Sequence, residues 1–161
     1  MKKVLIITYY WPPAGGPGVQ RWLKFIKYLP NFQIKPIVYC PDTPNYPQTD
    51  SSLLSDVSSD LTVLKTSIRE PYKWAQFFSK SKVSDLSKGL ISNPKKQSFL
   101  EKALLFIRGN FFIPDARISW VRPSVSFLSE YIKTHQIDTI VTTGPPHSLH
   151  LIGLQLKQKH A

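Results

Sequence analysis

Apolar residues in this chain occur as short continuous runs that alternate with longer stretches of three- and four-residue spacing. The first run, residues 3–8 (KVLIIT), is typical of a parallel strand covered on both faces. A helix is predicted from Gly18 to Leu29, and a second strand over Lys35–Cys40. This order predicts a βαβ unit. The helix positions expected to face the core are Val19, Trp22, Leu23, Phe25, Ile26 and Leu29.

The rest of the chain continues the alternation less regularly. Residues 42–60 are rich in Pro, Ser, Thr and Asp and predict a surface loop with one helical turn. Residues 67–98 are less regular: they predict one short helix, followed by a basic, serine-rich stretch from Ser79 to Gln97 that is expected to be mobile. The further elements predicted are a strand over Leu61–Thr66, helices over Ser98–Arg108 and Val121–His135, a strand over Ile137–Thr142 and a last helix from His147 or Ser148. The pattern predicts an α/β fold, a Rossmann-like three-layer αβα sandwich with a mainly parallel sheet.

Length and composition limit the class of protein. With 161 residues and 42% hydrophobic content, the chain is expected to form one globular domain, 1–161. Its single cysteine, Cys40, excludes a disulfide framework and favours a reducing, cytoplasmic compartment. The apolar run after Lys2 and Lys3 is too short for a signal peptide, and no stretch approaches 18 apolar residues.

Two loops carry the candidate chemistry. Gly15, Gly16 and Gly18 lie between the first strand and its helix, where bare backbone N–H groups at a helix N-terminus suit a phosphate or carboxylate. A second loop, residues 142–148 (TTGPPHS), also joins a strand to a helix, and it contains His147. Because ligands bind at the carboxyl edge of a doubly wound sheet, both loops are expected to line one ligand site.

Three separated segments, YYWPPAGGPGVQRW, FIPDARISW and TTGPPHSLHLIG, together resemble the amino-terminal half of family-four glycosyltransferases, which have the GT-B fold. The resemblance implies a retaining enzyme of the hexosyltransferase type that uses a nucleotide-sugar donor and a glycan or lipid-linked acceptor in cell-surface polysaccharide synthesis. It further implies that residues 1–161 are the acceptor-side half, inactive without a carboxyl-terminal domain that binds the donor. No metal or other cofactor is expected.

Site residues carry over from the resemblance by position. Gly15, Gly16 and Gly18 match the glycine loop that approaches the donor diphosphate, although Pro17 removes one N–H donor from it. His147 lies where the family presents polar groups to the acceptor or the transferred sugar, and it is the candidate catalytic residue. Arg21 and Asp115 are further candidates for binding the diphosphate or the acceptor. Each has a structural alternative: a tight turn for the glycines, a solvent-exposed position for Arg21, and a cap or turn for His147 and Asp115.

The net charge of +11 suggests an anionic partner. Phe99–Ile113 either packs as an ordinary core helix and loop or lies on an anionic membrane surface, which would make the protein peripheral on the inner face of the cell membrane. The residues expected to contact the membrane or a lipid-linked acceptor are Lys95, Lys96, Phe99, Lys102, Phe111 and Phe112.

Two other functions compete with a transferase. A stand-alone Rossmann dinucleotide-binding module would use Asp42, at the end of the second strand, to bind a ribose, but Arg21 stands where the dinucleotide fingerprint has its third glycine. A basic nucleic-acid-binding domain fits the charge, but no nucleic-acid module is recognisable, and nucleic acid is not expected as a partner.

Overall fold

The computed structural model describes residues 1–69 and 113–160. Its centre is a parallel sheet of four strands in the order β3-β2-β1-β4. The strands are β1 (Lys2–Ile7), β2 (Ile34–Asp42), β3 (Thr62–Ser67) and β4 (Thr139–Thr142). All three strand pairings are parallel, which confirms the expected parallel α/β sheet.

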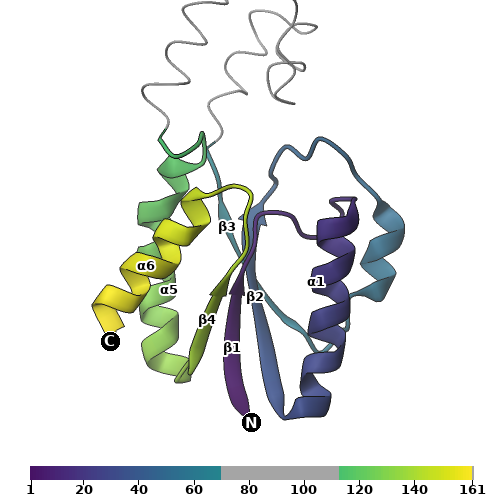
Figure 1. Ribbon diagram of the computed structural model, residues 1–161, viewed down its shortest axis with the longest axis horizontal. Coiled ribbons are helices and arrows are strands. Elements are labelled where there is room, and N and C mark those ends of the chain that lie inside the picture. The colour runs from purple at the N-terminus through teal and green to yellow at the C-terminus, as the bar shows by residue number, and fades with distance from the viewer. Residues whose placement is uncertain (70–112, 161) are drawn as a thin grey trace, which may run out of the picture.

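Helices cover both faces of this sheet. Helix α1 (Pro17–Tyr28) lies on one face, and α5 (Val121–His135) and α6 (Ser148–His160) lie on the other (Figure 1). Short 3-10 turns lie at η1 (Leu29–Phe32), η2 (Ser51–Asp56) and η4 (Ile118–Trp120). The three layers are those expected of a Rossmann-like fold.

Alternate residues of β1 supply the two sides of the core. Leu5 and Ile7 pack toward α5 and α6, whereas Ile6 packs toward α1. Successive side chains of a strand point to opposite faces, so a strand with helices on both sides needs apolar residues throughout. This requirement explains the continuous apolar run at residues 3–8.

The structure corrects two details of the sequence prediction. Phe25, expected in the core, is 53% exposed, and its ring contacts Trp22 edge to face at 5.6 Å. Strand β4 begins at Thr139 rather than Ile137, because Ile137 still donates its N–H to the carbonyl of Ile132 in the turn that ends α5. The last helix begins at Ser148, as predicted, and its residues Leu149, Ile152 and Leu156 are fully buried.

Candidate functional site

The loops after β1 and β4 emerge side by side at the carboxyl edge of the sheet (Figure 1). Ile7 pairs with Thr142, and the N–H of Thr143 donates to the carbonyl of Ile7 at 3.1 Å. The indole N–H of Trp22, on α1, donates to Oγ1 of Thr143 at 2.9 Å. The two loops are therefore neighbours, and the expectation that they line one ligand site stays a prediction.

Their position within the sheet has a topological meaning. The chain runs outward from β1 through β2 to β3, and then returns to the other side of β1 as β4. The order of the strands thus reverses between β1 and β4. In open α/β sheets the crevice outside the carboxyl ends at such a switch point is the usual ligand site.

The glycine loop is held from outside by residues 46–50. The N–H of Gly15 donates to the carbonyl of Gln48 at 3.0 Å, and the N–H of Asp50 donates to the carbonyl of Pro13 at 2.8 Å. The hydroxyl of Tyr46 donates to the carbonyl of Tyr9 at 3.1 Å. Residues 46–50, part of the predicted surface loop, therefore fix the path of the glycine loop.

The backbone requires glycine at Gly16 of this loop but not at Gly18. Gly16 has a φ of 110°, in the region that L-residues avoid. Gly18 has ordinary helical geometry, and a Cβ added there would meet nothing within 4 Å. The α1 N-terminus has no side-chain cap and no acidic residue in its first turn. The N–H groups of Gly15, Val19 and Gln20 already donate to the carbonyls of Gln48 and Gly16, so the bare N–H groups predicted for this loop reduce to those of Gly16 and Gly18.

The remaining predicted residues lie on or near the same edge. Arg21 is exposed on the second turn of α1, and His147 is exposed just before α6 begins. The ring of His147 lies 6.1 Å from that of His150, measured between centroids. His150 is exposed, and its Nδ1 is hydrogen-bonded to Oγ1 of Thr142 at 2.8 Å.

Asp115 lies against the N-terminus of α6. Its Oδ2 accepts the Ser148 N–H at 2.8 Å, and its Oδ1 accepts the Ser148 hydroxyl at 2.9 Å and the Arg117 N–H at 2.8 Å. A carboxylate here satisfies unpaired N–H groups and faces the positive end of the helix dipole. These contacts give Asp115 a positioning role, and its predicted contact with a ligand stays a prediction.

Arg117 is a residue that the sequence reasoning did not single out. Its guanidinium lies over the ring of Tyr9, 4.9 Å from the centroid, and donates to the Tyr9 hydroxyl at 3.2 Å. Tyr9 is fully buried two residues after β1, so this contact holds Arg117 at the carboxyl end of that strand. The only sequence signal was its place within the FIPDARISW segment.

Two titratable groups behind the edge are perturbed by burial. Desolvation raises the pKa of the Cys40 thiol to about 12. Desolvation also raises the pKa of Tyr39, against the lowering effect of hydrogen bonds with Ser124 and Thr66. Both side chains belong to the core, and neither is poised for acid–base chemistry near neutral pH.

The described residues bring together no group of three or more His, Cys, Asp or Glu that would hold a metal ion. Within the same residues, no helix is both long and apolar enough to cross a bilayer. The predicted membrane contacts Lys95, Lys96, Phe99, Lys102, Phe111 and Phe112 lie outside the described residues, as do the helix predicted over Ser98–Arg108 and almost all of segment 67–98.

Comparisons of the chain with protein-family models, curated proteins and solved structures find no match. The arrangement of the edge is therefore the basis for the function proposed below.

Proposed function

We propose that residues 1–161 are the acceptor-side, amino-terminal half of a retaining glycosyltransferase with a GT-B fold. The observation that carries the proposal is the meeting of the glycine loop and the His147 loop at the switch point between β1 and β4. The resemblance of three sequence segments to family-four enzymes supports it, because two of those segments form these loops and the third contains Asp115 and Arg117. In the proposed complete enzyme, a carboxyl-terminal half binds the nucleotide-sugar.

The glycine loop would act on the leaving group. In the reaction the acceptor hydroxyl oxygen bonds to the anomeric carbon, the bond from that carbon to the diphosphate oxygen breaks, and the hydroxyl proton passes to the departing diphosphate. The backbone N–H groups of Gly16 and Gly18 would stabilise the negative charge that grows on the diphosphate. His147 would orient the acceptor hydroxyl or contact the transferred sugar, without serving as an obligatory base.

Gly18 offers a sharp test, because an added methyl group is harmless to the fold. Nothing lies within 4 Å of the position that a Cβ would take, and the φ of Gly18 is ordinary. We expect Gly18→Ala in the complete enzyme to reduce kcat/KM at least tenfold, since the methyl group occupies space that the diphosphate needs. The thermal midpoint should stay the same or rise. Gln20→Ala, an exposed change in the same helical turn, serves as the matched control.

The measurement is transfer of labelled sugar from a panel of nucleotide-sugars. Residues 1–161 alone should transfer none. Gly18→Ala activity equal to that of the wild type, at equal stability, would show that no ligand approaches this glycine.

The proposed enzyme is cytoplasmic and peripheral on the inner face of the membrane. Sedimentation of the protein with anionic vesicles at low salt tests that location.

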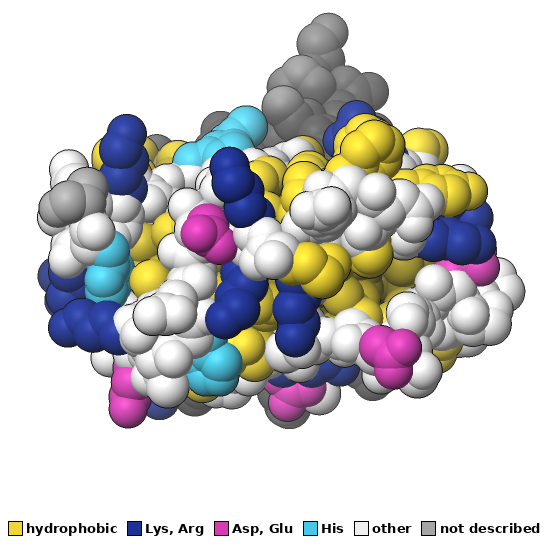
Figure 2. All heavy atoms as spheres, turned by 90° about the horizontal axis from the view of Figure 1, so that it is seen from below, with side chains coloured by type: hydrophobic (Ala, Val, Ile, Leu, Met, Phe, Trp, Pro, Cys, Tyr) yellow, Lys and Arg dark blue, Asp and Glu magenta, His cyan; other side chains and the backbone are white. Residues whose placement is uncertain are grey.

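A dinucleotide-binding module is the second candidate. Asp42 is the exposed last residue of β2, the neighbour of β1, where an acid would reach a ribose hydroxyl. A thermal-shift series separates the two functions: stabilisation by NAD but by no nucleotide-sugar would favour this one. A nucleic-acid partner is less well supported. On the face at which the strands begin, acidic side chains lie among the basic ones, so this face presents no continuous basic patch for a phosphate backbone (Figure 2).

A further inference from the structure

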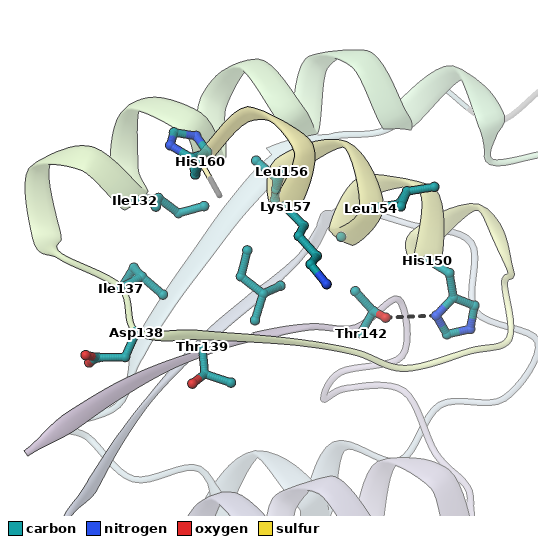
Figure 3. Close-up of a pocket in the computed structure, with 12 residues that line it drawn as sticks. Ile132, Ile137, Asp138, Thr139, Thr142, His150, Leu154, Leu156, Lys157 and His160 are labelled. Atoms are coloured by element: carbon teal, nitrogen blue, oxygen red, sulfur yellow. Dashed lines mark hydrogen bonds between the residues drawn. The ribbon is translucent and has the colours of Figure 1, made fainter.

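A hollow of about 620 Å³ lies at the amino edge of the sheet, opposite the edge of the glycine loop. Its walls come from the last turns of α1, the turn that joins η2 to β3, and the first residues of β2 and β3. Figure 2 looks onto this edge and shows the hollow, right of centre, as a recess with an apolar floor. The hollow beside Thr142 and His150, between β4 and α6, is smaller, at about 410 Å³ (Figure 3). The larger volume falls within the range of pockets that hold small molecules.

The floor of the larger hollow belongs to the core on the α1 side of the sheet. Leu23 and Ile26, on α1, are buried members of the core cluster on this side. Val57 and Leu61, before β3, are half-buried and pack against the same cluster. An apolar chain placed here would leave water for contact with these side chains, which favours its binding.

Lys27 adds a positive charge at the mouth of this hollow. It lines the hollow and is exposed, as is usual for a lysine whose aliphatic stem covers an apolar wall while its ammonium stays in water. Asp56, also at the hollow, pairs with Lys24 at 3.6 Å. Continuing the β2–β3 register by two residues places Asp60 opposite Lys35. In the part of the chain that the structure describes, no carboxylate forms an ion pair with Lys27, so its charge is the one that a ligand can neutralise.

We propose that this hollow binds a monomeric aliphatic carboxylate. Its chain lies over the apolar floor, and its head group accepts a charge-assisted hydrogen bond from the ammonium of Lys27. Both parts are needed, because an exposed lysine alone attracts anions only weakly and an apolar floor alone does not select a charge. The hollow and the glycine loop lie at opposite edges of the sheet, so this site does not depend on the proposed transferase activity.

The test uses residues 1–161 and follows the methyl signals of isoleucine and leucine by NMR. Butyrate, octanoate and octylammonium are added separately at constant pH and ionic strength, below the concentrations at which they form micelles. We expect octanoate to shift the Ile26 and Leu61 signals saturably and to leave those of Leu128, buried on the other face of the sheet, unchanged. Octanoate should bind at least about tenfold more tightly than butyrate, because its longer chain leaves water. It should bind at least about fivefold more tightly than octylammonium, because only the carboxylate can accept from Lys27.

Two variants that each remove one positive charge separate a built site from general attraction. Lys27→Gln should weaken octanoate binding at least about fivefold. Lys133→Gln, an exposed change on α5 and outside the hollow, should alter it less than about twofold. Equal weakening by both variants, unmoved Ile26 and Leu61 signals, or equal affinity for octanoate and either of the other two ligands would overturn the proposal. The Gly18→Ala test of the transferase is independent of all these results.

Discussion

Replacing Asp115 by alanine should separate its positioning role from any direct contact with a ligand. The carboxylate accepts three hydrogen bonds, two from Ser148 and one from the Arg117 N–H. Ser148 is almost fully buried at the first position of α6, and Asp115 is half-buried. Asp115→Ala therefore leaves a buried N–H and a buried hydroxyl without their partner.

The magnitude follows from these contacts. Loss of a helix cap costs about 0.5–2 kcal/mol. A buried donor left unsatisfied costs about 1–3 kcal/mol. The two overlap, since one of the lost bonds is the cap itself, and together they predict a fall of about 2–4 kcal/mol in the free energy of unfolding. Asp115→Asn keeps one acceptor oxygen but turns an amide N–H toward a donor, and should cost about half as much.

Urea unfolding, monitored by far-UV circular dichroism and tryptophan fluorescence, measures this difference. Asp60→Ala is the control, because it removes the same charge from an exposed turn and should change the free energy by less than about 0.5 kcal/mol. If Asp115→Ala were as stable as Asp60→Ala, the hydrogen bonds to Ser148 would not hold α6, and the positioning role would be refuted.

Three further predictions concern buried contacts. Gly153→Ala should destabilise the protein by about 1–3 kcal/mol, because its methyl group would overlap Thr142; an unchanged melting temperature would contradict this. Tyr39→Phe should cost about 1–2 kcal/mol in urea unfolding, since it removes the hydroxyl that donates to the buried Ser124 at 2.7 Å, and a neutral result would mean that water replaces it. Burial raises the pKa of the Cys40 thiol from 9.0 to about 12, so the folded state keeps the thiol protonated, and the free energy of unfolding falls as the pH rises from 9 toward 12. Cys40→Ala should lack this fall. Rapid thiol labelling at pH 8 would contradict the burial of Cys40.

Much of the fold is readable in the sequence because the periodicity of apolar residues reports burial directly. Helix α5 begins and ends where the three- and four-residue spacing predicts, at Val121 and His135. A continuous apolar strand requires cover on both faces, and the glycine loop between strand and helix is a local feature. Even the edge at which both loops emerge follows from a parallel sheet alone.

Contacts between distant residues could not be read in this way. Phe25 fits the apolar stripe of α1, yet its side chain is 53% exposed in the folded chain. Nothing local to Thr143 indicates that Trp22, 121 positions away, donates to its hydroxyl. Likewise, the carboxylate of Asp115 could face solvent, a ligand or a helix end, and its partner Ser148 lies 33 positions along the chain.

The sequence by itself determined the class of fold, the parallel direction of the strands and the positions of the two loops, since these depend on local spacing and backbone freedom. Only the tertiary structure decided that β4 lies beside β1, which places the switch point between the glycine loop and the His147 loop. It also decided that Thr142 holds His150 above a hollow. The physical reason is that strand order and side-chain pairing depend on how the whole chain buries its apolar surface, and no single segment contains that information.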